Sequence, residues 1–253
     1  MSGWARLRNH PRRRVLVSNL MMQAILFDFN GVIIDDERIH LRAYREVLKE
    51  HNIELTDEDY FQCLGMDDLT FTRAAFARAG REVDDETTRD IIDREHALHR
   101  SIIEAEVPFG AGVVTFIREA ARKFQLGIVS MAELAEIEHV LGPANLLPHF
   151  SVIVTAVPGL KHKPAPDCYV RGLELLNEKR RTDRQLPLLP HECLVIEDAP
   201  PGVQAGRGAG MKTLAVTNTV AEPLLRAAGA DVVTASLADW NTDAVKHVFN
   251  HSH

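Results

Sequence analysis

Short apolar runs alternate with amphipathic stretches along most of the chain, and this alternation restricts the possible folds more than any other feature. Most of the runs are apolar at consecutive positions, which is typical of strands covered on both faces. The runs span residues 23–29, 126–129, 152–155, 193–196, 213–216 and 231–234, and helical patterns occur at 111–123, 133–141, 167–177, 202–209 and 223–228. Strands and helices in this order form right-handed βαβ units. The sequence therefore predicts an α/β fold with a doubly wound, Rossmann-like parallel sheet.

Two intervals break the alternation. Residues 36–107 show helical periodicity only, in about four segments, and Thr56 with three acidic residues after it indicates a helix N-terminus. We therefore expect a core domain of residues 22–35 and 108–253 with an inserted all-helical cap domain of residues 36–107, which would lie over the strand ends as a lid. Residues 178–191 are polar and contain two prolines, which predicts a surface loop.

The first 21 residues differ in composition from the rest of the chain. They contain five arginines and no acidic residue, whereas the whole chain of 253 residues has a formal net charge of −7. The apolar stretch in this segment is too interrupted for a secretory signal, so we expect a basic, solvated extension. The acidic balance argues against a nucleic-acid partner, and no apolar run approaches the ~18 residues of a membrane helix. Three cysteines without CxxC spacing indicate free thiols and a cytoplasmic protein.

Polar side chains lie at or near the ends of several predicted strands. Asp28 ends the first strand, Ser130 follows the second, and Lys163 lies in a proline-rich stretch before a helix. Glu197 and Asp198 are adjacent at the end of another apolar run. The carboxyl ends of parallel strands share one edge of a sheet, so we expect these residues to meet there. Carboxylates this close repel one another unless a cation separates them, and oxygen ligands of this kind suit Mg²⁺.

This combination of residue types favours phosphoryl transfer. A carboxylate can attack phosphorus and form an aspartyl-phosphate. A magnesium ion, a lysine and a hydroxyl group can then neutralise and orient the oxygens of the transferred group. A dehalogenase with an aspartate nucleophile has less need of a metal, so the acidic pair Glu197 and Asp198 favours a phosphate substrate.

Four segments carry a resemblance to a known family. DFNGVIIDDE, IVS, KPAPD and CLVIEDAPPGVQAGRGAGM stand in this order and resemble the motifs of the haloacid dehalogenase-like hydrolase superfamily. The match is to the branch with a helical cap, which includes β-phosphoglucomutase and sugar-phosphate phosphatases, and it covers about residues 22–235. The resemblance implies that Asp28 is the nucleophile and that Ser130 and Lys163 bind the transferring phosphate.

The same resemblance implies a metal site and one residue of the cap. Asp28, the backbone carbonyl of Asn30 and Asp198 would hold Mg²⁺, with Glu197 in or beside that ligand shell. His40 matches a histidine near the hinge in the mutase-like members, which makes it a candidate substrate-binding residue. An ordinary surface histidine on an amphipathic helix is an equally good interpretation of His40.

One loop of the expected cap gives information on the substrate. Mutase-like members carry basic residues there to hold a second phosphate, whereas residues 63–68 of this chain read CLGMDD. A bisphosphate intermediate is therefore not expected. Gly65, Asp67 and Asp68 are predicted substrate-binding residues, and the two carboxylates would accept hydroxyls of a sugar or pair with an amine. The alternative for Asp67 and Asp68 is a helix N-cap followed by a first-turn acid.

Asn30 departs from the family pattern. Family phosphatases have a second aspartate here, which protonates the leaving group and then activates water, and an amide does neither at a useful pKa. Loss of this help costs ~10²–10⁴-fold in rate. Three explanations are open: a slow hydrolase or phosphotransferase for substrates with good leaving groups, a phosphate-ester-binding protein without catalysis, or conversion of Asn30 to aspartate through a succinimide, which the following Gly31 favours.

The sequence thus predicts a Mg²⁺-dependent phosphatase or phosphotransferase-type hydrolase whose partner is a small phosphorylated metabolite. Its rate is expected to be reduced because of Asn30. The alternative is a catalytically impaired binding protein or regulator that retains the metal and phosphate site. We expect a monomer or a weak homodimer.

Overall fold

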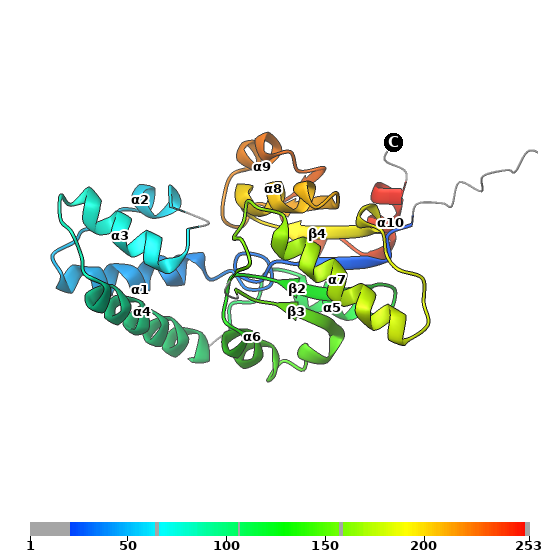
Figure 1. Ribbon diagram of the computed structural model, residues 1–253, viewed down its shortest axis with the longest axis horizontal. Helices are drawn as coiled ribbons and strands as arrows, with labels where there is room; N and C mark the ends of the chain where they lie inside the picture. The colour runs from blue at the N-terminus through cyan, green and yellow to red at the C-terminus, as the bar shows by residue number, and fades with distance from the viewer. Residues whose placement is uncertain (1–20, 64–65, 106, 157–158, 251–253) are drawn as a thin grey trace, which may run out of the picture.

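The computed structural model describes residues 21–63, 66–105, 107–156 and 159–250 (Figure 1). Gly65 and residues 1–20 of the predicted basic extension lie outside the described residues. Six strands form one parallel sheet in the order β3-β2-β1-β4-β5-β6. The strands are β1 (Ala24–Phe27), β2 (Gln125–Val129), β3 (Phe150–Val154), β4 (Cys193–Glu197), β5 (Lys212–Val216) and β6 (Val232–Thr234). The predicted α/β fold with a doubly wound parallel sheet is confirmed.

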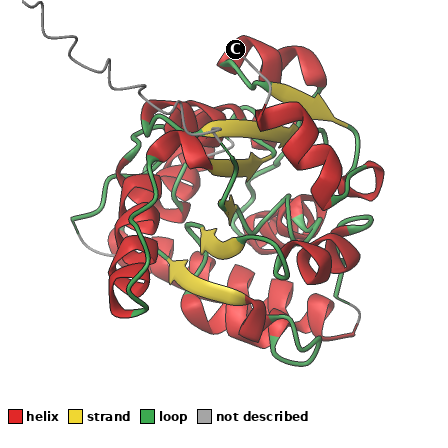
Figure 2. Cartoon of the chain, turned by 90° about the vertical axis from the view of Figure 1, so that its right-hand side faces the viewer, coloured by secondary structure: helices red, strands yellow, loops and turns green. Residues whose placement is uncertain are grey.

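Helices cover both faces of the sheet (Figure 2). The covering helices are α5 (Val113–Ala120), α6 (Leu134–Leu141), α7 (Asp167–Thr182), α8 (Pro200–Gly208), α9 (Glu222–Ala228) and α10 (Thr242–Asn250), and short 3-10 helices lie at Leu147–His149, Pro190–Glu192 and Leu237–Asp239. In β1, Ile25 and Phe27 belong to the core cluster that contains residues of α5, α6 and α10, whereas Leu26 belongs to the cluster that contains residues of α7 and α8. This burial on both faces explains why β1 is apolar at consecutive positions.

The end of α7 differs from the prediction. A loop was expected from residue 178 onward, but α7 continues to Thr182. The prediction was wrong for residues 178–182 because polar residues also form helix surfaces, and lysine and arginine have high helix propensity. The last turn carries Lys179, Arg180 and Arg181, whose positive charges interact favourably with the helix C-terminus.

A helical unit lies beyond the strand ends that precede Asp28 and Asp198 (Figure 1). It consists of α1 (Glu37–Glu50), α2 (Asp57–Phe61), α3 (Asp68–Arg78) and α4 (Asp85–Ala105), and residues from all four helices share an apolar cluster of their own. Thr56 caps α2, as predicted, by accepting a hydrogen bond from the backbone N–H of Asp59 at 3.1 Å. The exact domain boundaries remain a prediction.

The two connections between the helical unit and the sheet lie side by side. Ile34 and Phe109 form an antiparallel bridge, and the backbone N–H of Asp35 donates to the carbonyl of Pro108 at 2.8 Å. The backbone N–H of Gly110 also donates to the carbonyl of Ile33 at 3.0 Å. The outgoing and returning segments therefore form a paired junction.

Two further features concern the cysteines and the apolar content of the helices. Cys63, Cys168 and Cys193 are buried and free of disulfide bonds. Among the described residues, no helix is both long enough and apolar enough to span a membrane.

Candidate active site

The polar residues predicted at the strand ends lie at the carboxyl edge of the sheet. Asp28 follows β1, Ser130 follows β2, and Lys163 lies in the connection between β3 and α7. Glu197 is the last residue of β4 and Asp198 follows it. Because β1 lies between β2 and β4, these side chains approach one another at the centre of the sheet. This is the point where the strand order changes direction, and such a point is the usual place of a binding site in a doubly wound sheet.

Lys163 is the centre of a buried charged group. Its Nζ lies 2.9 Å from Asp28 Oδ1 and 2.7 Å from Glu197 Oε1, and it donates to the carbonyl of Val129 at 3.2 Å. The Tyr169 hydroxyl donates to the same Glu197 oxygen at 2.5 Å. Three acceptors thus face the three N–H groups of an ammonium whose side chain is only 8% exposed. Lys163 therefore fixes the orientation of the Asp28 carboxylate.

The ionisable groups around Lys163 have perturbed pKa values. Burial alone would lower the pKa of Lys163, but the neighbouring Asp28 and Glu197 carboxylates raise it, so the ammonium stays charged. Burial and the charge of Asp28 raise the pKa of Glu197 to about 7, although Lys163 and Tyr169 partly oppose this. Burial, together with Glu197 and Asp28, also raises the pKa of Asp198 well above its ordinary value. The single positive charge of Lys163 therefore does not neutralise the negative charges of the three nearby carboxylates.

The three carboxylates fit a divalent cation with oxygen ligands. Asp28, Glu197 and Asp198 offer carboxylate oxygens that lie within 4.8 Å of one another. Gly31, with φ of +72°, turns the chain beside them, and a Cβ atom there would lie 1.9 Å from Asp198 Oδ2. The Asn218 side chain donates to the Gly31 carbonyl at 2.7 Å, which holds this turn in place. Such a set of hard oxygen donors around a small space suits Mg²⁺.

The Asn30 amide participates in a different contact. Its Nδ2 donates to Asp36 Oδ2 at 2.8 Å and to Glu136 Oε1 at 3.3 Å. Asp36 precedes α1, and Glu136 lies on α6. The side chain that replaces the expected general acid therefore links the sheet to the base of the helical unit.

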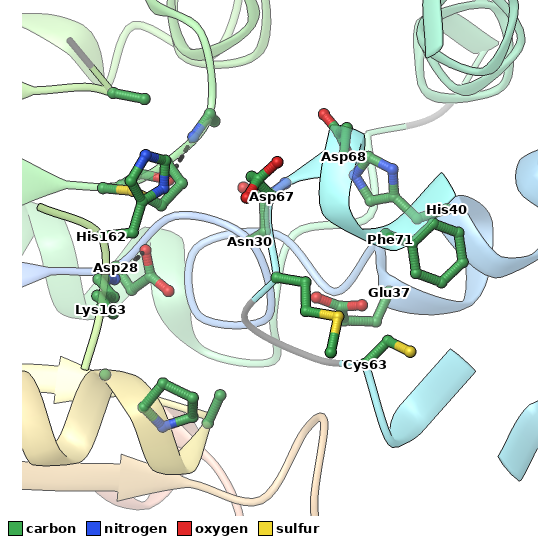
Figure 3. A pocket seen from close by; sticks show the side chains of 18 of the residues that line it. Asp28, Asn30, Glu37, His40, Cys63, Asp67, Asp68, Phe71, His162 and Lys163 are labelled. Carbon is green, nitrogen blue, oxygen red and sulfur yellow. Dashed lines mark hydrogen bonds and ion pairs between the residues drawn. The ribbon is translucent and has the colours of Figure 1, made fainter. Parts of the chain in front are cut away.

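A cavity of about 570 Å³ lies between the sheet edge and the helical unit. The predicted site residues that line it are Asp28, Asn30, Ser130, Lys163, Glu197 and Asp198, with His40, Asp67 and Asp68 from the helical unit. Figure 3 shows Asp28 beside Lys163 on one side, His40 and Asp68 on the other, and Asn30 between them. Ser130 is buried, and its oxygen accepts a hydrogen bond from the backbone N–H of Ala132 at 3.1 Å, so its O–H can still donate into the cavity.

The residues from the helical unit have structural partners as well. Asp67 is the N-cap of α3 and Asp68 is in its first turn, which is the alternative arrangement for this pair. The Tyr44 hydroxyl donates to Asp68 at 2.7 Å, and His40 Nδ1 lies 2.9 Å from Glu95 Oε1. These side chains therefore face the cavity in fixed orientations. Their role in substrate binding remains a prediction.

Sequence reasoning did not identify several polar residues of this region. They are Asp36, His99, Glu136, Tyr169 and Asn218. One signal was available: Asp36 and His40 are four residues apart, which is the spacing of neighbours on a helix face. The remaining contacts depend on how distant elements pack.

Gly202, in the first turn of α8, leaves the space that the Glu197 side chain occupies, and a substitution at Gly202 tests this packing. A Cβ atom at Gly202 would lie 1.9 Å from Glu197 Cδ, so Gly202→Ala must displace this buried carboxylate. We expect the variant to lose about 1–3 kcal/mol in the free energy of unfolding, measured by urea denaturation. Gly208→Ala in the same helix is the control, because the nearest atom to its Cβ would be 3.3 Å away in Pro166. A loss of more than about 0.5 kcal/mol in the control, or no loss in Gly202→Ala, would contradict this prediction.

Comparison with known proteins identifies the family. A model of the haloacid dehalogenase-like hydrolase family matches residues 25–216. The chain therefore belongs to this family, as the motifs predicted. It is 27% identical over 192 residues to the fructose-1-phosphate phosphatase YqaB of Escherichia coli (strain K12), which covers 76% of this chain and 95% of that protein.

Two further similarities concern a longer protein and a solved structure. The chain is 27% identical over 215 residues to the protein SUPPRESSOR OF QUENCHING 1, chloroplastic, of Arabidopsis thaliana, which covers 84% of this chain but 19% of that protein. The chain thus spans about a fifth of this relative. The crystal structure of β-phosphoglucomutase from Clostridium difficile matches with a TM-score of 0.77 and 20% identity, over 91% of this chain and 98% of that chain. This likeness concerns the fold.

Proposed function

We propose that the protein is a Mg²⁺-dependent phosphatase for a small phosphorylated metabolite of the sugar-phosphate type, and that it acts through an aspartyl-phosphate on Asp28. The observation that carries this proposal is the Asp28 carboxylate, held by Lys163 at 2.9 Å and lining a cavity of about 570 Å³. The similarity to the fructose-1-phosphate phosphatase supports a sugar-phosphate substrate.

In the first step, an oxygen of Asp28 forms a bond to phosphorus while the bond between phosphorus and the substrate oxygen breaks. The substrate oxygen leaves with the electron pair of that bond and takes its proton from a water molecule, because Asn30 has none to give. Lys163 keeps the carboxylate in position, and the Ser130 hydroxyl donates to an oxygen of the phosphoryl group. In the second step, water attacks the aspartyl-phosphate, which releases inorganic phosphate and regenerates Asp28. The helical unit limits the access of bulk water to the cavity during the first step.

The metal would be held by Asp28, Asp198 and the backbone carbonyl of Asn30. Glu197 lies beside this group, where Lys163 and Tyr169 hold it. When bound, Mg²⁺ supplies positive charge that neutralises the oxygens of the transferring phosphoryl group.

Asn30 supports a second candidate function, that of a phosphate-ester-binding protein or regulator with little catalysis. Its amide is engaged with Asp36 and Glu136, and it has no titratable proton to give to a leaving group. Turnover of alkyl phosphates should therefore be slow, and substrates with good leaving groups should react faster.

Hydrolysis assays with and without metal test the proposal. We expect slow turnover of p-nitrophenyl phosphate and of at least one phosphorylated sugar, with loss of activity in EDTA and recovery with Mg²⁺ but not with Ca²⁺. Calcium requires more ligands at longer distances than magnesium, so it should not position the phosphoryl group. Full activity in EDTA would contradict the role of the metal. Normal binding of Mg²⁺ and phosphate without turnover of any substrate would instead favour the regulator.

A further inference from the structure

A second group of potential metal ligands lies at the junction between the helical unit and the core. It consists of Asp36, His40, His99 and Glu136, whose ligand atoms lie within 4.8 Å of one another. Asp36 precedes α1, His40 is on α1, His99 is on α4 and Glu136 is on α6. No residue of this group belongs to the set formed by Asp28, Glu197 and Asp198. We call it the junction cluster.

The two histidines of the junction cluster both direct their Nε2 atom toward the Asp36 carboxylate. Their rings stack with centroids 3.7 Å apart and an interplanar angle of 12°. The Nε2 atoms of His40 and His99 lie 3.3 Å and 3.0 Å from the same atom, Asp36 Oδ2. His40 Nδ1 faces Glu95 Oε1 at 2.9 Å. A proton on Nδ1 would leave the Nε2 lone pair free, and a carboxylate behind a histidine in this way is typical of metal sites.

Asp36 provides an independent sign of a missing ligand. The residue is 0% exposed, and its Oδ1 is buried without a hydrogen-bond partner. A buried acceptor without a partner is unfavourable, and an ion or a water is the usual explanation. A hollow of about 20 Å³ lies at the same junction, and the residues that line it include His40, His99 and Glu136 but not Asp36. This volume is sufficient for one ion or one water molecule.

We propose that the junction cluster is a binding site for one transition-metal ion of the zinc type. Two imidazole nitrogens and two carboxylates form a donor set that suits Zn²⁺, whereas Mg²⁺ prefers oxygen ligands alone. Tetrahedral ligands at about 2.0–2.1 Å from zinc lie about 3.3 Å from one another. The present separations of up to 4.8 Å therefore require only small movements of the four side chains.

Metal binding at this position would connect three elements. The ion would tie α1 and α4 of the helical unit to α6 of the core, next to the amide of Asn30 that already contacts Asp36 and Glu136. The site would therefore fix the helical unit relative to the cavity. This inference does not rest on the proposed phosphatase function, because it concerns binding of the metal alone.

Zinc titration of the full chain, in competition with a chromophoric chelator, tests this inference. We expect one Zn²⁺ per chain with wild type, and a loss of about 100-fold or more in affinity for His99→Gln and for Glu136→Gln. His51→Gln is the matched control, because His51 lies at the C-terminal end of α1 and its ring packs against Phe76, outside the junction cluster and its hollow. Asp198→Asn is the second control. Both controls should bind Zn²⁺ within about 3-fold of wild type, and excess Mg²⁺ should not displace it.

Two further measurements make the result independent of folding defects. Far-UV circular dichroism checks each variant, and the partly exposed Glu136 offers a test if the buried His99→Gln variant does not fold. Cobalt, as a spectroscopic substitute, should give the visible absorption of a tetrahedral site in wild type and lose it in Glu136→Gln. The inference is overturned if wild type binds no Zn²⁺ at micromolar concentration. It is also overturned if His99→Gln and Glu136→Gln bind as tightly as wild type, or if Asp198→Asn alone abolishes binding.

Discussion

Asp28→Asn is expected to reduce the turnover of p-nitrophenyl phosphate by at least about 10³-fold, which corresponds to ~4 kcal/mol of activation free energy. The amide has nearly the shape of the carboxylate, and its oxygen can still accept a hydrogen bond from Lys163, which lies 2.9 Å from Asp28 Oδ1. It lacks the negative charge of a nucleophile that attacks phosphorus. The loss would therefore reflect chemistry rather than a change of fold.

Two measurements separate a lost nucleophile from a damaged site. Asp35→Asn removes an exposed carboxylate seven residues further on, and it should keep activity within about 2-fold of wild type. Acid quenching during turnover of a radiolabelled substrate should leave label on wild type, cleavable by hydroxylamine as expected of an acyl phosphate, and none on Asp28→Asn. Wild-type turnover by Asp28→Asn would exclude Asp28 as the nucleophile.

The sheet and the edge that holds the site could be predicted from the sequence because their signals are local. β4 consists of five buried residues, and a covered parallel strand of this kind is a continuous apolar run. The positions of Asp28 and Asp198 then follow from topology, because every parallel strand ends at the same edge. The N-caps at Thr56 and Asp67 are local as well, since each side chain bonds a backbone N–H three residues later.

The junction cluster could not be predicted because its contacts join distant parts of the chain. His99 contacts a carboxylate 63 residues away, and Asn30 contacts a glutamate 106 residues away. A histidine or glutamate on an amphipathic helix has the same local pattern whether it faces solvent or a neighbouring helix. Only the packing of α1, α4 and α6 decides between these cases. Helix α10 was also absent from the predicted elements, although it follows the predicted strand at residues 231–234.

Asn30→Asp is expected to increase turnover by ~10²–10⁴-fold, because it supplies the carboxyl group that can protonate the leaving group and then activate water. The structure adds a physical reason for the protonation state of the new group. The Asn30 amide lies 2.8 Å from Asp36 and 3.3 Å from Glu136, so a carboxylate in its place would meet two other acids. Repulsion should raise the pKa of the new carboxyl group or turn it toward the cavity, and both changes favour a general acid.

The same substitution should reduce stability. Burial would raise the pKa of Asp36, but hydrogen bonds from His40 and His99 outweigh this and lower it, so Asp36 is ionised at neutral pH. Asn30→Asp replaces a donor to this ion with an acceptor, and the free energy of unfolding should fall by about 1.5–3 kcal/mol. Thermal and urea denaturation would measure this loss.

The double variant Asn30→Asp/Asp36→Asn separates the two effects. It exchanges the donor and the acceptor of one hydrogen bond at unchanged net charge, but it also weakens the contacts of residue 36 with His40 and His99. Stability should therefore recover in part relative to Asn30→Asp while the carboxyl group at position 30 remains. We expect turnover in Mg²⁺ without added zinc to exceed wild type in both variants. If neither variant exceeds wild type although both bind Mg²⁺ and phosphate, the missing carboxyl group is not what limits this site, and the regulator becomes the better assignment.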